Sequence, residues 1–528
     1  MTRFCPAVAA GALLVVLAYA NHWNNPFHFD DDHTIVHNAS IRELTNLPRL
    51  LTDATAASIY PTHAVYRPLT YVTLAVDYAI AGGLEPAVFH FSTFLGFLGL
   101  LASLLVLTRR VLDAAVRDPA NRWYALFGTT LFGVHPVAAD TVNYIIQRAE
   151  LWAAAGVVAS MAIFAARPDW RRYGLFLIPA VLAVLAKTTA AIFPFLVFAY
   201  QAIVEREPRI ARWPTMGAAL VAAALVMGLC SVMTFSTGTF DPGAPPFAQY
   251  VWTQPWVALR YLRSFPLPVD LSIDPGWAPL ASPLEGRALA GYLGVLLLVI
   301  SSIVLARRRE TAAVAFGLGW FMVALLPASI YPLAEVTNDH RMFLPHMGLA
   351  MATAGGLQWM AQRDRRPRRS IGLVVALVVL TVASIGTWQR NKVWSSDEAV
   401  WRDASAKNPA NGRARMNYGV ALMQRGDLVQ ALRELEQAAV HSPRYHFLEV
   451  NLGIVKAASG RPAEAEAHFE RSLALAPHSP VGYFHYGRWL RAQGRDAEAI
   501  ARFQQALAID ADDLRARHEL LSALAHPP

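Results

Sequence analysis

Long apolar runs fill the first 390 residues, and they constrain the fold more than any other feature of the sequence. Helices of roughly 17 to 25 apolar residues cross a bilayer. The runs are 4–20, 87–108, 123–137, 150–166, 173–187, 189–204, 214–235, 288–306, 311–330, 344–361 and 371–388. Only 16% of the residues are charged, against about a quarter in a soluble protein. The sequence therefore predicts an all-α protein with a membrane domain of about 11 transmembrane helices, of which the two beside Lys187 are short.

Two apolar segments near the N-terminus, the run 4–20 and the segment 69–82, differ from ordinary spans. The first run resembles a signal peptide, but it passes directly into Asn21, His22 and Trp23 and many more apolar runs follow it, so we expect an uncleaved first helix. The segment 69–82 is too short to cross a bilayer and is interrupted by Asp77, which predicts an interfacial helix. Cys5 and Cys230 lie in apolar runs and have neither a disulfide nor a metal-site spacing.

Arginine clusters predict which way the membrane domain faces. They occur in alternate loops, and the positive-inside rule places such loops in the cytoplasm. The clusters are Arg109/Arg110/Arg117/Arg122, Arg167/Arg171/Arg172, Arg206/Arg209/Arg212, Arg307/Arg308/Arg309 and Arg363/Arg365/Arg366/Arg368/Arg369. The loops 21–86, 138–149, 236–287 and 331–343, which we call the outer loops, then face the periplasm, or the lumen in a eukaryote. An odd number of spans puts the C-terminal domain on the same side.

The basic residues also bear on partners and on the source. The net charge of +8 follows from the loop arginines, so it gives no reason to expect a nucleic-acid partner. Lysine is rare, since it occurs only at Lys187, Lys392, Lys407 and Lys456, and alanine is abundant. This composition favours a GC-rich bacterial genome, and hence the bacterial inner membrane as the location.

A 34-residue period runs through the C-terminal region. The positions that repeat are Pro443/Pro477, Gly419/Gly453/Gly487, Gly426/Gly460/Gly494, Ala431/Ala465/Ala499 and Leu435/Phe469/Phe503. This is the tetratricopeptide spacing, with a small residue where two helices touch and glycine at the turn. We predict a membrane domain over 1–390, a linker or helical adaptor over 391–410, and over 411–528 an α-solenoid of three repeats with a capping helix at 514–525. Such a groove binds a peptide or partner protein, or else the array is a spacer or dimerisation surface.

The first outer loop begins with three adjacent carboxylates, Asp30, Asp31 and Asp32, in FHFDDDH. Mutual repulsion raises the pKa of one carboxyl among several, which suits it to accept a proton. The same residues could bind a divalent cation, or form a solvated acidic turn.

Other ionisable residues lie at the ends of spans on the same predicted side. Charged groups at membrane depth are expensive and mark functional sites. They include Arg67, His135, Asp140, Arg148, Lys187 and Arg341. Cations beside carboxylates suit an anionic, lipid-linked substrate, in which the cations hold phosphate. Singly, each has a simpler explanation: a lone Lys or Arg snorkels to the interface, and His135 before Pro136 ends a helix.

In order along the chain, these motifs are F-x-F-D-D, YRPLT, HPVAADTVNYIIQRAE, AKT and DHRMFLP, followed by the repeats. Together they resemble the transmembrane and tetratricopeptide repeat O-mannosyltransferases and their bacterial relatives, over nearly the whole chain. That family is similar to the C-type (GT-C) membrane glycosyltransferases, which take a sugar from a polyprenyl-phosphate carrier on the extracytoplasmic face.

The resemblance implies roles for individual residues. Asp30 or Asp31 would be the base that deprotonates the acceptor hydroxyl, so that it attacks the anomeric carbon with inversion. The lipid phosphate would be held by Arg67, Arg148, Lys187 and Arg341, and the sugar pocket shaped by His135 and Asp140. The sequence departs from the family at three points: Asp32 adds a third carboxylate, Asp140 replaces the usual Glu, and His340 stands where a Glu often precedes the arginine.

The leading hypothesis is a membrane glycosyltransferase that uses a polyprenyl-phosphate sugar and a protein acceptor bound by the repeats. Alternatives are a transferase acting on a glycolipid or surface polysaccharide, and a non-catalytic anchor whose repeats scaffold an envelope assembly. A transporter is disfavoured because its charges would lie near the bilayer midplane. No metal-ligand or nucleotide motif is present, and a divalent cation remains an open possibility as cofactor.

Overall fold

The computed structural model describes residues 4–237, 243–363, 369–511 and 513–525. Within these ranges the chain is helical and contains no strand, so the predicted all-α class is confirmed. The chain divides into two compact units, one formed by 1–271 and 277–396, the other by 272–276 and 397–528. We describe the first as the membrane domain and the second as the repeat domain.

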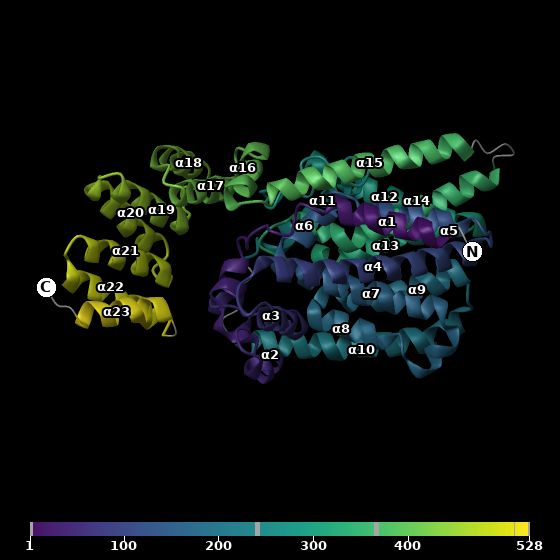
Figure 1. Cartoon of the computed structure of the whole chain (residues 1–528), viewed down its shortest axis with the longest axis horizontal. Helices are drawn as coiled ribbons and strands as arrows, with labels where there is room; N and C mark the ends of the chain where they lie inside the picture. Colours follow the sequence, from purple (N-terminus) through teal and green to yellow (C-terminus); the bar gives the residue numbers. More distant parts are fainter. Residues whose placement is uncertain (1–3, 238–242, 364–368, 512, 526–528) are drawn as a thin grey trace. The chain divides into compact units, whose positions relative to one another are not determined.

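The described residues of the membrane domain form fifteen α-helices. They are α1 (Phe4–Ala18), α2 (Leu47–Thr52), α3 (Pro68–Ala81), α4 (Pro86–Ala115), α5 (Asn121–Gly133), α6 (Ala138–Asn143), α7 (Arg148–Ala166), α8 (Leu177–Ala186), α9 (Phe193–Ala199), α10 (Arg209–Phe235), α11 (Phe247–Ser264), α12 (Gly286–Ala306), α13 (Ala312–Ile330), α14 (Phe343–Arg363) and α15 (Arg369–Val393). Figure 1 shows α4, α7, α8 and α10 running side by side.

Seven helical segments within the described ranges are long and apolar enough to cross a membrane. They are Pro86–Ala115, Ile145–Ala166, Thr188–Glu205, Arg212–Phe235, Gly286–Ala306, Arg309–Ile330 and Ser370–Val393. The other predicted spans form α1, α5, α8 and α14, which fall short of that length or apolarity. The chain is thus a multi-pass membrane protein, and the total of eleven spans stays a prediction.

The core of the membrane domain is built on α4, α7, α13 and α14. Phe97, Val157, Phe316 and Met347, one from each helix, are all fully buried. Small residues let these helices approach closely, as is common in membranes. A Cβ added at Gly348 of α14 would lie 2.5 Å from the Gly317 carbonyl oxygen of α13.

The outer loops contain more helix than the sequence predicted. The third loop, 236–287, forms the 18-residue α11, and we predicted no helix there from the sequence. The residues that α11 buries follow the spacing of one helix face: Tyr250, Thr253, Gln254, Val257, Arg260, Tyr261 and Ser264. Several are polar, so the helix does not register as an apolar run. The helix predicted at 69–82 is present as α3.

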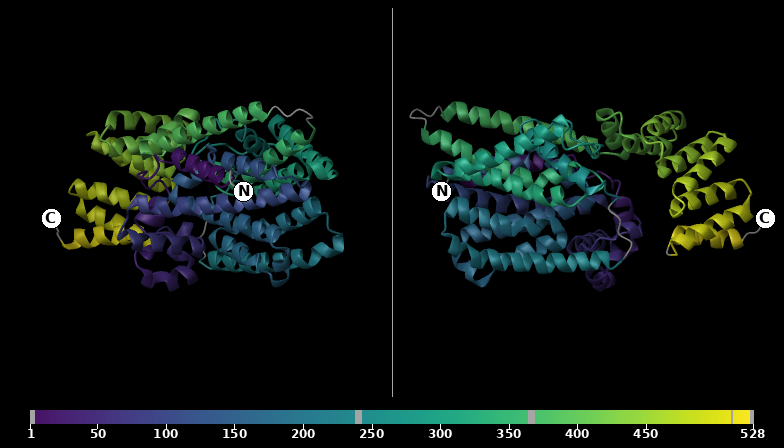
Figure 2. Two further views of the ribbon diagram at one scale, coloured as in Figure 1. Left: turned by 45° about the vertical axis from the view of Figure 1, so that its right-hand side comes forward. Right: turned by 180° about the vertical axis from the view of Figure 1, so that it is seen from behind.

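The repeat domain consists of antiparallel helix pairs, and the predicted solenoid is confirmed (Figure 2). Its helices are α16 (Asp397–Lys407), α17 (Gly412–Gln424), α18 (Leu428–His441), α19 (His446–Ala458), α20 (Pro462–Leu475), α21 (Pro480–Ala492), α22 (Asp496–Ile509) and α23 (Leu514–Ala525). A Cβ on the packing glycine of each pair would lie 2.7–2.8 Å from the large residue of the partner helix, in the pairs Gly419–Leu435, Gly453–Phe469 and Gly487–Phe503. The turn glycines Gly426, Gly460 and Gly494 have φ of 88°, 74° and 74°, which glycine adopts without strain.

Candidate functional site

Residues from all four outer loops meet within the membrane domain. Asp31 of the first loop accepts a hydrogen bond from the Ile146 backbone N–H of the second (2.8 Å). Arg260 of the third loop pairs with Asp339 of the fourth (2.8 Å). The negative charge of Asp339 in turn raises the pKa of Asp140 in the second loop. The fold therefore brings these four loops, far apart in sequence, into one region.

Asp31 is fully buried and fixes the first loop to the second. One carboxylate oxygen accepts from the His28 backbone N–H (3.0 Å) and the other from Ile146. Burial raises the pKa of Asp31 to about 7, although these hydrogen bonds and the nearby His28 oppose the rise. Because both oxygens are engaged by the backbone, Asp31 suits a positioning role.

Asp30 is the member of the triplet that remains accessible. Its side chain is 38% exposed, and its backbone N–H donates to the Tyr144 hydroxyl (2.9 Å). Burial raises the pKa of this carboxyl, but hydrogen bonds from His33 and Tyr144 outweigh burial and bring the pKa below its ordinary value. Asp30 is therefore ionised at neutral pH. The preceding Phe29 has φ of 46°, a left-handed conformation that non-glycine residues rarely adopt.

Asp32 is the most exposed carboxylate of the triplet. Its side chain is 59% exposed and lies 3.1 Å from His37. The three carboxylates thus have three different sets of partners. The described residues hold no group of three His, Cys, Asp or Glu side chains that could bind a metal.

His33 holds the Asp30 carboxylate in position, a role that we did not predict from sequence. Its Nε2 lies 3.5 Å from the Asp30 carboxylate, and its Nδ1 lies 2.8 Å from the Ser58 hydroxyl. The centroid of the His63 ring lies 4.9 Å from that of the His33 ring. The spacing of three residues between Asp30 and His33 was visible in the sequence, but its partner Ser58 was not.

Three of the predicted phosphate-binding cations lie in one group. The charges of Arg67 and Arg341 both act on Lys187, which forms an ion pair with Glu150 (2.7 Å). Arg341 donates to the Glu335 carbonyl oxygen (2.7 Å). Arg67 is half-buried, and its side chain has no hydrogen-bond or ion-pair partner among the described residues. Arg67 thus keeps all five of its N–H donors for a ligand.

Tyr71 of α3 connects this cation group with the accessible carboxylate. It is buried, and the charges of Arg67 and Asp30 both act on its hydroxyl. His340 belongs to the same group, because burial and the charges of the three cations bring its pKa well below the ordinary value. His340 is therefore neutral at physiological pH and adds hydrogen-bonding capacity without charge.

Arg148, predicted to hold phosphate, is placed elsewhere. It is fully buried, forms an ion pair with Asp77 of α3, and donates to the Phe89 carbonyl oxygen of α4 (2.9 Å). Asp77 also accepts from Ser92 (2.6 Å). The guanidinium of Arg148 therefore joins α3, α4 and α7.

His135 is likewise engaged by the protein. Its Nε2 lies 2.8 Å from the Phe265 carbonyl oxygen, and its ring stacks on that of Phe265 at 5.2 Å. His346 contacts it edge-on at 5.8 Å. These contacts join α14 and the end of α11 to the start of the second outer loop.

Asp140 is 3% exposed, and neither of its carboxylate oxygens has a hydrogen-bond partner among the described residues. Burial and the charge of Asp339 raise the pKa of Asp140 to about 7, and Arg390 opposes this rise. Asp140 therefore lies with a second charged group, formed by Asp339, Arg260 and Arg390, and not with the cations around Lys187.

Comparison with known proteins bears on both units. The tetratricopeptide repeat family matches residues 397–445 and 445–512. Protein O-mannosyl-transferase TMTC4 of Mus musculus is 22% identical over 79% of this chain and 64% of its own length. Protein O-mannosyl-transferase TMTC3 of Mus musculus is 23% identical over 88% of this chain and 54% of its own length. For TMTC1 of Homo sapiens the identity is 24%, over 85% of this chain and 57% of that protein.

These matches confirm the resemblance on which the motif analysis relied. They extend over both the membrane domain and the repeats of this chain, which spans 54–64% of the length of these relatives. The chain is therefore a relative of proteins named as O-mannosyl-transferases that also carries tetratricopeptide repeats.

Proposed function

We propose that this chain is a membrane glycosyltransferase that moves a sugar from a polyprenyl-phosphate donor to a hydroxyl group of an acceptor protein on the extracytoplasmic side. One observation carries the proposal. The charges of the ionised, accessible Asp30 and of the unpartnered Arg67 both affect the Tyr71 hydroxyl, so both residues lie near it. The charge of Arg67 also affects the Lys187 ammonium group. A base beside grouped cations is what transfer from a lipid phosphate requires.

Asp30 is the carboxylate best suited to act as the base. It is ionised at neutral pH, so it can accept a proton, and it is reachable from outside. Asp31 is occupied by two backbone N–H groups, and Asp32 faces His37 and solvent. His33 and Tyr144 hold the Asp30 carboxylate in place, which matters because a base must lie within hydrogen-bond reach of the proton it removes.

Arg67, Lys187 and Arg341 form the group that would hold the leaving phosphate. Arg67 has no other partner among the described residues, so it binds a phosphate without breaking a contact. Lys187 reaches the phosphate by leaving Glu150. Cations fixed where negative charge develops stabilise the transition state more than mobile water does.

The proposed transfer step uses Asp30, Arg67 and Lys187. The acceptor O–H gives its proton to Asp30, and its oxygen forms a bond to the anomeric carbon. The bond between that carbon and the phosphate oxygen breaks, and its electron pair leaves with the phosphate, which Arg67 and Lys187 neutralise. Because attack and departure are on opposite sides, the configuration at the anomeric carbon inverts.

The repeats give a reason to favour a protein acceptor over a glycolipid. Solenoids of this type present an extended groove to peptides and proteins, and the relatives are named for transfer to protein. We propose that the groove binds the acceptor chain. We further propose that the chain lies in the bacterial inner membrane, as its composition predicts, and that the repeats lie in the periplasm, as the arginine clusters and the odd number of predicted spans indicate.

The experiment that tests the proposal uses the purified full-length chain in detergent. It is incubated with polyprenyl-phosphate carrying radiolabelled mannose or glucose and with a serine- and threonine-rich peptide, and labelled peptide is counted. We expect transfer from one of the donors. Absence of transfer from both, with label passing instead to an added glycolipid, would move the acceptor to lipid. Absence of all transfer by folded protein would leave the scaffold alternative.

A further inference from the structure

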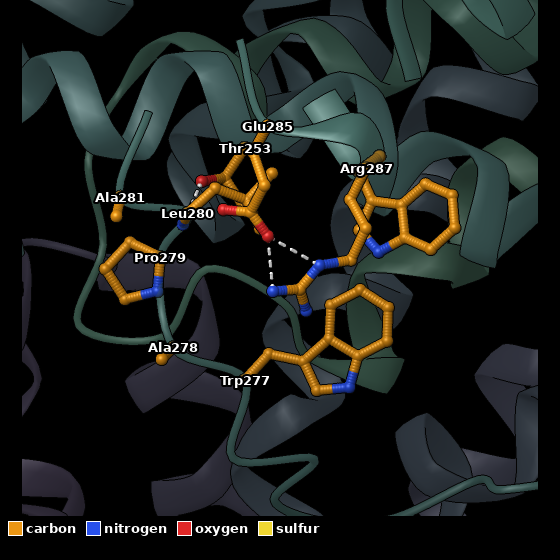
Figure 3. A pocket seen from close by; sticks show the side chains of 9 residues that line it. Thr253, Trp277, Ala278, Pro279, Leu280, Ala281, Glu285 and Arg287 are labelled. Carbon is orange, nitrogen blue, oxygen red and sulfur yellow. Dashed lines mark hydrogen bonds and ion pairs between the residues drawn. The ribbon is translucent and has the colours of Figure 1, made fainter. Parts of the chain in front are cut away.

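The third outer loop and the start of α12 line a partly open pocket (Figure 3). Its lining includes none of the site residues discussed above. It has a volume of about 290 Å³ and lies between α11, the segment 277–281 and the first turn of α12. Its walls include the indole rings of Trp256 and Trp277 and the ion pair between Arg287 and Glu285.

The pocket is built on a fixed frame. Trp252 donates its indole N–H to the Leu280 carbonyl oxygen (2.8 Å), and the Leu280 N–H donates to the Thr253 hydroxyl (2.9 Å). The loop is thereby held against α11 on both sides of Leu280. A Cβ added at Gly291 would lie 2.5 Å from the Trp256 backbone nitrogen, so α12 packs directly on α11. A preformed site binds without the loss of entropy that ordering a loop entails.

The polar groups of the pocket offer both donors and acceptors. Arg287 contacts Glu285 through Nε (2.8 Å) and Nη2 (2.5 Å), and both contacts go to the same carboxylate oxygen. Neither side chain has a further partner among the described residues. Several guanidinium N–H groups and the second carboxylate oxygen therefore remain for a ligand. In the view of Figure 3, the Arg287 side chain lies between Glu285 and the Trp277 ring.

We propose that this pocket binds a single neutral sugar ring. The C–H faces of a pyranose are apolar and match indole faces, and its hydroxyl groups both donate and accept, as the ion pair does. A phosphate in the pocket would be attracted by Arg287 but repelled by Glu285, which lines the same pocket. An apolar chain would remove water from the ion pair without replacing its hydrogen bonds. The volume is at the lower end of small-molecule sites, about 300–1,000 Å³, which fits one ring.

This site goes beyond the proposed transferase reaction, because sugar binding here requires neither Asp30 nor the cation group. The two proposals can therefore fail separately. Asp30→Asn should remove transfer and leave sugar binding in the pocket intact. Conversely, sugar binding that persists in a chain without transferase activity would support the pocket alone.

The test measures binding of methyl α-mannopyranoside and methyl β-glucopyranoside to the full chain in detergent by saturation-transfer NMR titration. We expect wild-type binding in the millimolar range or tighter, on the order of −4 kcal/mol at 1 mM. Trp277→Ala should weaken it at least tenfold, and Trp277→Phe, which keeps an aromatic face, should weaken it less. Glu285→Gln, which keeps the shape of the pocket, should weaken it severalfold. The matched control is Trp170→Ala, an exposed tryptophan 5.4 Å from Arg167 in another loop, and it should change nothing.

Three outcomes would overturn the inference. The first is no binding of either glycoside by the folded wild type. The second is binding that is equal in Trp277→Ala, Glu285→Gln and the Trp170→Ala control. The third is displacement of the bound glycoside by inorganic phosphate at equal concentration, which would identify an anion site.

Discussion

Lys187 and Glu150 form an ion pair at 2.7 Å, with the lysine at the residue after α8 and the glutamate in the first turn of α7. Both side chains are largely buried, at 12% and 8% exposed. The cation proposed to receive a phosphate is thus already paired in the free protein. Donor binding therefore exchanges one anion for another at Lys187, and the glutamate becomes a competitor if the lysine is lost.

The first prediction follows from that competition. In Lys187→Met the carboxylate of Glu150 is left beside the incoming phosphate, so repulsion adds to the lost attraction. We expect the donor KM to rise about 100-fold in Lys187→Met. In the double variant with Glu150→Gln, the donor KM should be about tenfold lower than in Lys187→Met, a difference of about 1.4 kcal/mol. Donor titrations of the transfer rate measure both. A double variant no better than Lys187→Met would show that Glu150 has no such effect.

Arg67 gives the second prediction, because it has no partner to lose among the described residues. Arg67→Gln should raise the donor KM about tenfold while leaving the thermal unfolding midpoint unchanged. The control is Arg49→Gln in the same loop, where an exposed arginine pairs with Asp53 at 3.2 Å. It should alter neither quantity. A fall in the unfolding midpoint of Arg67→Gln would instead indicate a structural role.

The third prediction separates Arg148 from the phosphate-binding group. Arg148→Met leaves Asp77 as an uncompensated buried carboxylate, which destabilises by about 3–5 kcal/mol. Adding Asp77→Asn should restore most of the stability. Detergent-based unfolding of the single and double variants measures this coupling. Strong loss of donor affinity in a stably folded Arg148→Met protein would contradict the connector role.

The fourth prediction concerns pH. The pKa of Asp140 is raised from an ordinary value of 3.8 to about 7, so between these values the folded state holds a proton that the unfolded state has released. Stability should therefore fall as the pH rises from about 4 to about 7. A shift of about three units corresponds to at most about 4 kcal/mol. Asp140→Asn should flatten this part of the profile of unfolding midpoint against pH, and an unchanged slope would exclude the effect.

Much of the fold followed from local sequence patterns. The repeats were predictable because Gly453 and Phe469, like their equivalents, recur at positions that must touch. Seven long apolar segments were predictable from their length and composition. Helix α11 was not, because its buried face includes the polar residues Thr253, Gln254 and Arg260. The polar partners of Gln254 and Arg260 lie on the fourth outer loop, far away in sequence.

The candidate site was less predictable, because its division depends on long-range pairs. Arg148 and Lys187 look alike in sequence, as single cations near span ends. Their separation rests on Asp77, 71 residues before Arg148, and on Glu150, which leaves Lys187 near Arg67. The aspartate triplet is similar: one of the two backbone N–H groups that bind the Asp31 carboxylate belongs to Ile146, 115 residues away.

The assignment of Asp30 as the base is tested most directly by the turnover number of sugar transfer in three matched proteins: wild type, Asp30→Asn and Asp32→Asn. Loss of a general base lowers rates by about 10²–10⁴, so Asp30→Asn should lose at least 100-fold in kcat with its fold intact. Asp32→Asn, whose side chain faces solvent, should keep wild-type turnover. Equal turnover in all three proteins would contradict the account.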